Sequence, residues 1–163
     1  MAETIINNVR KRIIKEHLND PAYYDRMSVL LEGIIADLKA KRLDYKQYLL
    51  QIADLAKQVQ QGKADTDPLR DQSAGVRAIF NNMLATEDGT SRVAEQPPES
   101  PESVQERVAL ALAIDNAVKQ ARPDGWRENV IKERVVRNAI KKVLNDATEA
   151  ERIFQIIKQQ REY

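Results

Sequence analysis

The sequence predicts an all-α fold, a helical bundle of about six to seven helices with a helical hairpin near the N-terminus and one long loop. Apolar residues recur at helical spacing along almost the whole chain. The 163 residues include only five glycines and six prolines, so few positions interrupt a helix. No segment of useful length alternates apolar and polar residues as a half-buried strand does.

The first two helices are predicted from apolar spacing and a start signal. Residues 3–18 form a helical pattern whose apolar positions are Ile5, Ile6, Val9, Ile13 and Ile14. Asp20 and Pro21 then supply an N-cap and a proline at the first helical position. The helix that they start carries an apolar stripe of Tyr24, Met27, Leu30, Leu31, Ile34, Ile35 and Leu38.

The third helix has a defined start and a defined end. Asp44 and Gln47 form an Asp variant of the capping box, which starts the helix at Tyr45. Gly62 ends it. Because the connection near residues 42–43 is short, we expect the second and third helices to form an antiparallel hairpin.

The middle of the chain contains one helix and one loop. Asp67 and Pro68 are another start signal, and the helix that follows carries Val76, Ile79, Phe80, Met83 and Leu84. Residues 86–102 are rich in proline, serine and acidic side chains, so we expect a linker or long loop there. Helical structure resumes at Pro101 or at a Ser103–Glu106 capping box.

The last third predicts a basic amphipathic helix and a final helix. A turn at residues 123–125 leads into the only tryptophan, Trp126, and a helical pattern runs from there to Leu144. Its basic side is expected to carry Arg127, Arg134, Arg137 and Lys141. Its packed side is expected to carry Ile131, Val135, Val136, Ala139, Ile140 and Val143. A Thr148–Glu151 capping box starts the final helix.

These elements predict two helical lobes. Residues 1–85 form the N-terminal lobe, residues 86–102 connect it, and residues 103–163 form the C-terminal lobe. We expect the second lobe to pack on the first as one compact domain, since the chain length suits one domain or two small lobes.

The composition limits the classes of function. The formal net charge is +1, so any affinity for nucleic acid must come from local patches. There is no cysteine, hence no disulfide, thiolate nucleophile or Cys-based metal site. No run approaches about 18 apolar residues and the N-terminus lacks a signal-peptide core, so we expect a cytoplasmic protein that does not contact the membrane.

Complete catalytic motifs are not found in the sequence. It lacks the glycine-rich nucleotide-binding patterns and the nucleophile elbow. His17 is the only histidine, and it lies near the C-terminal end of a predicted helix. The helix dipole favours a partly charged imidazole there, so its position needs no functional explanation. Asp37 and Asp44 each begin a D-x-K spacing, which helical charge periodicity explains better than a nuclease site. We therefore expect no enzymatic activity and no catalytic, cofactor-binding or metal-binding residue.

Two basic surfaces are candidates for binding. The better organised is the Arg127, Arg134, Arg137 and Lys141 stripe; the weaker is a cluster of Arg10, Lys11, Arg12 and Lys15, with Arg26 nearby. Each is either a solvated face paired to nearby acids or a surface that contacts phosphates or an acidic partner. Trp126 either anchors the helix start in the core or acts as an interface hot spot.

Several segments resemble one known family. They are residues 2–61, residues 113–118, a W-R-x-N-x-x-K-E pattern and the ending K-Q-Q-x-E-Y. The pattern is formed by Trp126, Arg127, Asn129, Lys132 and Glu133. Together they are similar to the C-terminal region of the restriction (R) subunit of type I restriction–modification enzymes. The resemblance covers most of the chain apart from the segment near 86–102.

The resemblance implies a non-catalytic part of a larger machine. In that family a nuclease domain and two helicase-like motor domains precede a helical segment of this kind, and ATP and Mg²⁺ bind only in those upstream domains. The subunit translocates and cleaves DNA together with methylation (M) and specificity (S) subunits. The chain would then be a separately expressed C-terminal fragment, and no catalytic residue of the family falls on any position in it.

Three functions follow as hypotheses. The first is an interaction domain that attaches the R subunit to the M and S subunits, using candidate residues Trp126, Arg127, Asn129, Lys132, Arg134, Arg137 and Lys141. The second is a domain that contacts duplex DNA through its basic helix faces and supports its passage to the motor. The third is a structural module that closes the motor domains and binds nothing.

Overall fold

Helices are the only regular secondary structure in the described part of the protein. The computed structural model describes residues 2–63, 68–83 and 101–163. Within those ranges there are seven α-helices and no strand, which confirms the predicted all-α bundle. The helices are α1 (Ala2–Glu16), α2 (Pro21–Lys39), α3 (Tyr45–Gln61), α4 (Ala74–Asn82), α5 (Pro101–Ala121), α6 (Val130–Leu144) and α7 (Ala147–Gln159). They belong to two compact units, Met1–Arg70 and Asp71–Tyr163.

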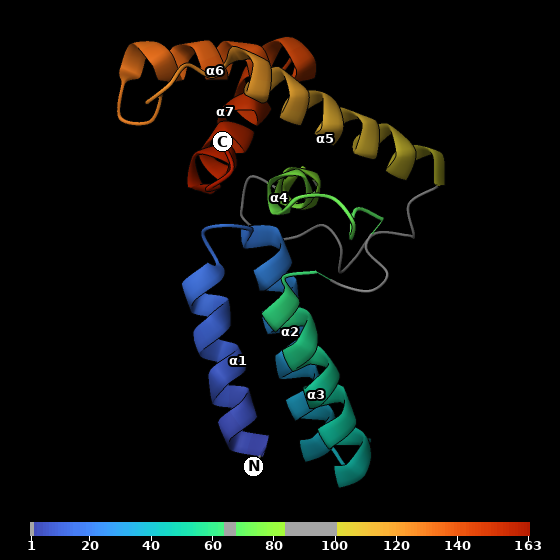
Figure 1. Ribbon diagram of the computed structural model, residues 1–163. Helices are drawn as coiled ribbons and strands as arrows, with labels where there is room; N and C mark the ends of the chain where they lie inside the picture. The colour runs from blue at the N-terminus through green and yellow to red at the C-terminus, as the bar shows by residue number, and fades with distance from the viewer. Residues whose placement is uncertain (1, 64–67, 84–100) are drawn as a thin grey trace. The chain divides into compact units, whose positions relative to one another are not determined.

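The first unit is a three-helix arrangement. Helices α1, α2 and α3 lie side by side, and each contacts the other two (Figure 1). Tyr23 is buried among them, and its hydroxyl donates a hydrogen bond to the backbone oxygen of Gln58, 2.8 Å away. The buried core of this unit consists of Ala2, Ile6, Val9, Ile13, Tyr23, Tyr24, Met27, Leu31, Tyr48, Ile52, Leu55 and Val59.

The predicted helix ends in this unit are confirmed. The Asp20 side chain accepts a hydrogen bond from the Tyr23 amide, with Pro21 at the first helical position. The capping box of Asp44 and Gln47 is formed at the start of α3. Gly62 ends α3 in the left-handed conformation, with φ of 68°. A short turn over residues 40–44 joins α2 to α3, so the two helices form the expected antiparallel hairpin (Figure 1).

The second unit contains the other four helices. Helix α4 packs on α5 and α7, α5 packs on α6, and α6 packs on α7. The buried apolar residues include Val76, Ile79, Phe80, Ala111, Ile114, Val118, Trp126, Val136, Ile140, Ile153, Phe154, Ile157 and Tyr163. These helices share one core because each of them contributes residues to it.

The position of α4 differs from the predicted lobe boundary. The sequence places this helix in a lobe that ends at residue 85, whereas α4 belongs to the unit that begins at Asp71. The reason is that its apolar face packs on α5 and α7. Of the predicted linker over 86–102, the part up to residue 100 lies outside the described residues, as does Leu84, and Pro101 begins α5.

Two helix starts also differ from their predicted signals. Ser73 caps α4 by accepting from the Val76 amide, and Asp67, the predicted start, lies outside the described residues. Asp146 caps α7 by accepting from the Thr148 and Glu149 amides, at 2.9 and 3.0 Å. In both cases a short polar side chain other than the predicted one, six residues after Asp67 for α4 and two residues before Thr148 for α7, satisfies free amides of the first turn.

Two glycines of the first unit give a matched test of this description. Gly33 lies on the exposed side of α2, and a Cβ built there meets nothing within 4 Å. Gly33→Ala should raise the free energy of unfolding by about 0.5–1 kcal/mol, because alanine loses less backbone entropy in a helix. Gly62→Ala should lower it by roughly 1 kcal/mol, because Gly62 is left-handed. Urea denaturation measures both, and a loss of stability in Gly33→Ala would contradict the exposed helical position.

Candidate interaction surface on helix α6

The basic helix begins later than the sequence predicts. Residues 126–129 form a turn, and α6 starts at Val130. Glu128 has a φ of 69°, which is incompatible with a continuing right-handed helix. The Asn129 side chain is the N-cap and accepts from the amides of Ile131 and Lys132, at 3.1 and 3.2 Å. Asn129 is therefore used inside the fold, and Arg127 is not part of the basic stripe on α6.

Trp126 is an anchor in the core of the second unit. Its relative exposure is 3%, and its ring meets the Phe154 ring edge to face, with 5.8 Å between centroids. Its indole Nε1 donates to the backbone oxygen of Tyr163 at 3.2 Å. A buried tryptophan needs such a partner. Trp126 was expected to be either a core anchor or an interface hot spot, and its burial is that of a core anchor.

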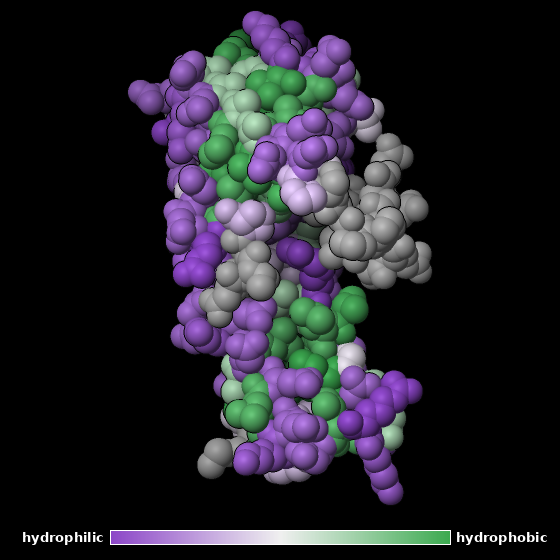
Figure 2. Space-filling model, turned by 90° about the vertical axis from the view of Figure 1, so that its right-hand side faces the viewer, coloured by the Kyte–Doolittle hydropathy of each residue, from purple (hydrophilic) through white to green (hydrophobic). Residues whose placement is uncertain are grey.

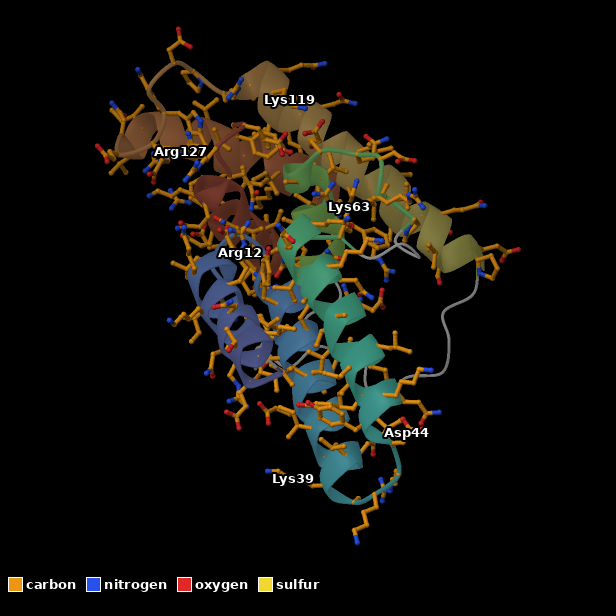
Figure 3. All side chains as sticks on the ribbon, turned by 60° about the horizontal axis from the view of Figure 1, so that its bottom comes forward. Arg12, Lys39, Asp44, Lys63, Lys119 and Arg127 are labelled. Atoms are coloured by element: carbon orange, nitrogen blue, oxygen red, sulfur yellow. The ribbon has the colours of Figure 1, made fainter. Side chains whose placement is uncertain are left out.

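Arg127 binds the end of α7. Its Nε donates to the backbone oxygen of Lys158 at 3.1 Å, and a terminal nitrogen donates to the backbone oxygen of Gln160 (Figure 3). The guanidinium also lies over the Trp126 ring, 4.8 Å from its centroid. The last carbonyl groups of a helix have no partner within the helix. Arg127 satisfies them, so its charge is used within the fold.

A third side chain completes this contact. Arg122 donates to the backbone oxygen of Glu162 at 3.2 Å. Carbonyl groups along residues 158–163 thus accept hydrogen bonds from side chains at the turn between α5 and α6. We name this set of contacts the C-terminal clamp, with donors Arg122, Trp126 and Arg127 and acceptor carbonyls of Lys158, Gln160, Glu162 and Tyr163.

The side chain of Tyr163 adds a second attachment. Its buried hydroxyl donates to the Asp115 carboxylate, and Lys119 Nζ lies 3.0 Å from the other oxygen of that carboxylate. Burial raises the pKa of the Tyr163 hydroxyl well above its usual value, and the hydrogen bond to Asp115 raises it further. The Glu162 carboxylate accepts from the amide of Gly75 in the first turn of α4. The end of the described chain is therefore tied to α4 and α5 as well as to the turn before α6.

Glu133 is turned into the fold. Its relative exposure is 6%. One carboxylate oxygen lies 2.7 Å from Lys158 Nζ and accepts from the Glu128 amide at 3.3 Å. The hydrogen bond from Lys158 lowers the pKa of Glu133 below the ordinary value of 4.5 despite the opposing effect of desolvation, and the charge of Arg137 contributes in the same direction.

Arg137 is held by acids and by an aromatic ring. Its guanidinium lies 3.4 Å from Glu133 and 2.8 Å from Glu151, and 4.1 Å from the centroid of the Phe154 ring. Lys132, another predicted site residue, donates to the backbone oxygen of Asp124 at 2.6 Å. Arg137 and Lys132 therefore both make contacts inside the second unit. For Arg137 this agrees with the alternative in which the basic face is paired to nearby acids.

Arg134 and Lys141 are the two members of the predicted stripe that remain available. Both are exposed, as is Lys142 beside them. None of the three has an acidic partner within the described ranges. At about 100° per residue, these three residues lie on the same side of α6. The stripe of four cations is thus reduced to two, and Lys142 joins them.

Apolar residues share this exposed side. Ile131 is 80% exposed, Val130 69% and Val135 43%. We expected Ile131 and Val135 on the packed side, and their exposure corrects that prediction. The packed side is instead formed by Glu133, Val136 and Ile140, because the contacts of Glu133 with Lys158 and Arg137 turn it inward. On an ideal helix the exposed residues span an arc of about 140°.

We name this surface the α6 face. Its members are Val130, Ile131, Arg134, Val135, Asn138, Lys141 and Lys142. Exposed apolar residues next to hydrophilic ones occur on both units, as the hydropathy colouring illustrates (Figure 2). The α6 face combines exposed apolar side chains with cations that lack acidic partners in the described structure. Surface apolar residues in such a cluster are typical of interaction sites.

The weaker candidate at the N-terminus divides into paired and exposed cations. Arg10 lies 2.7 Å from Glu32. Arg12 projects from α1 (Figure 3), and its guanidinium lies 3.5 Å from the Glu16 carboxylate. Lys11 and Lys15 are exposed and have no acidic partner among the described residues. Arg10, Lys11 and Arg12 are consecutive and point in different directions round α1, whereas Lys11 and Lys15 are four residues apart and lie on the same side. Nearby, Arg26 lies over the Tyr23 ring, and His17 lies 2.8 Å from Asp25.

A charge-neutral variant tests the role of Glu133. Because folding lowers its pKa, Glu133 stabilises the fold above its unfolded pKa, and this stabilisation is lost as pH falls through the lower folded value. Glu133→Gln should therefore be less stable than wild type near pH 7, and the difference should be smaller near pH 3, because acid protonates Glu133 and weakens its ion pairs. Urea denaturation at the two pH values measures this. Glu106→Gln, at an exposed position of α5, controls for net charge. An equal difference at both pH values would contradict the ion pair.

The described residues offer the α6 face as the best organised candidate site. Among them no group of three or more histidine, aspartate or glutamate side chains is arranged to hold a metal ion. None of the described helices combines the length and apolar character needed to cross a membrane. In comparisons with protein-family models, curated proteins and solved structures, no match to the chain was found.

Proposed function

We propose that this chain is a non-catalytic helical domain that docks a type I restriction R subunit onto its M and S subunits. The observation that carries the proposal is the α6 face, where exposed Ile131 and Val135 lie beside Arg134 and Lys141. Apolar side chains gain free energy when a partner covers them, and cations at the rim select an acidic partner. This combination is suited to binding a protein.

The C-terminal clamp supports the same proposal. It fixes the turn before α6 and the end of α7, so the α6 face is presented by a helix that is held at its start and along its inner side. A site on a rigid element loses little conformational entropy when a partner binds. The partner that we propose comes from the resemblance to the R subunit. The surface that we propose for its contact is the α6 face.

Contact with duplex DNA is the second candidate. Arg134, Lys141 and Lys142 are exposed on one side of α6, and such cations bind phosphates. The apolar residues favour the protein partner, because Ile131, at 80% exposure, would gain nothing against a phosphate backbone. The two candidates therefore differ in what should cover Ile131.

Binding of the purified chain separates these functions. Titrated with the assembled M and S subunits, it should form a complex at micromolar protein, measured by calorimetry and size-exclusion chromatography. Titrated with duplex DNA instead, it should bind weakly, and any binding should fall steeply as salt increases.

Two binding results would contradict the proposal. No complex with the M and S subunits at micromolar protein would count against a docking domain. Tight duplex binding that is abolished in an Arg134→Glu, Lys141→Glu double variant would favour the DNA-contacting function in its place. The double variant Lys39→Glu, Lys46→Glu makes the same charge change at exposed positions of the first unit and serves as the control.

A further inference from the structure

We propose that the segment of the partner seated on the α6 face is an amphipathic helix with acidic residues beside its apolar stripe. This inference rests on the proposed docking function and adds the chemistry of the partner. It follows from how apolar and charged residues are divided along α6, and from where the acids of this helix point.

The apolar part of the α6 face lies in its first two turns. Val130, Ile131 and Val135 are 69%, 80% and 43% exposed. Ile131 and Val135 are four residues apart, so they lie one above the other on the helix surface. Such a pair forms a short apolar ridge, which fits the groove between apolar side chains of a second helix. A partner must therefore supply apolar side chains at this end.

The basic part of the face is not neutralised by α6 itself. Arg134, Lys141 and Lys142 are exposed there, and the acid of α6, Glu133, points inward to Lys158 and Arg137. The outer side of α6 therefore carries three cations and no carboxylate among its described residues. A partner segment with carboxylates opposite Arg134, Lys141 and Lys142 completes the ion pairs that the fold leaves open.

The shape of the face selects a helix. It runs along one side of α6 from Val130 to Lys142, about 18 Å at 1.5 Å per residue. A strand would need a sheet edge to satisfy its backbone, and the described part of the protein has no strand. A helix satisfies its own backbone and can place apolar residues at positions i, i+3, i+4 and i+7 against this ridge.

The test uses two sets of variants in the whole chain. One set alters the apolar ridge, Ile131→Asp alone and with Val135→Asp. The other reverses charge, Arg134→Glu with Lys141→Glu. Both sets change exposed side chains, so the fold should persist, which circular dichroism and thermal unfolding check. The control is Lys39→Glu with Lys46→Glu, at exposed positions of α2 and α3.

Two partners are titrated against these proteins. The first is the assembled M and S subunits. The second is a pair of synthetic 18-residue helical peptides with the same leucine stripe, one flanked by glutamate and one flanked by lysine. Each α6 variant should bind the assembly at least about tenfold more weakly than wild type, as expected for central interface residues. The control should bind as wild type does. The glutamate peptide should bind the wild-type chain more tightly than the lysine peptide does.

The outcomes separate this inference from the function on which it rests. If the assembly binds the wild-type chain and all α6 variants equally, docking stands and the α6 face is not its site. If the charge reversal has no effect while Ile131→Asp does, the acidic character of the partner is wrong. If the assembly does not bind the wild-type chain, the docking function fails and the inference fails with it. Variants that lose duplex DNA binding and keep the assembly would assign the face to nucleic acid and overturn the inference.

Discussion

The second unit depends on one constraint: the carbonyl groups along residues 158–163 need hydrogen-bond donors, and the turn before α6 supplies them. Trp126 and Arg127 reach the carbonyls of Tyr163, Lys158 and Gln160. This fixes the turn at 126–129 and brings Lys158 to Glu133, which sets the inward side of α6. Because the inward side is set, the outward side is set as well. The exposed position of Ile131 and Val135 is thus a consequence of contacts on the opposite side of the same helix.

The sequence predicts the helices better than it predicts their orientation. Caps such as Asp44 with Gln47 act within a few residues, so the start of α3 can be read locally. The rotation of α6 cannot be read in this way, because its apolar residues surround much of the helix and two rotations bury comparable stripes. Two ion pairs that join α6 to α7 select one of these rotations; they are Glu133 with Lys158 and Arg137 with Glu151. Periodicity contains no information about such pairs, so the pairing of Arg137 stayed open in the sequence and Ile131 was expected on the packed side.

The signature residues of the resemblance have a structural explanation. Trp126, Arg127, Asn129, Lys132 and Glu133 each have a partner inside the second unit. Two patterns far apart in the chain, one starting at Trp126 and one ending at Tyr163, are therefore the two sides of one contact. The residues best placed to meet another molecule, Arg134 and Lys141, lie outside the W-R-x-N-x-x-K-E pattern. The W-R-x-N-x-x-K-E pattern and the K-Q-Q-x-E-Y ending thus describe how the second unit of this chain is held together.

The most direct measurement of the central claim is the reactivity of single thiols on α6. The chain has no cysteine, so Ile131→Cys and Val136→Cys each introduce one probe, at positions that are 80% and 0% exposed. If the clamp sets the rotation of α6, the thiol at 131 reacts with an alkylating reagent at the rate of a free thiol and the thiol at 136 reacts far more slowly. Adding Arg127→Lys, which removes the two-point contact with Lys158 and Gln160, should make the thiol at 136 reactive. Equal rates at the two positions, or no response to the loss of Arg127, would contradict the account.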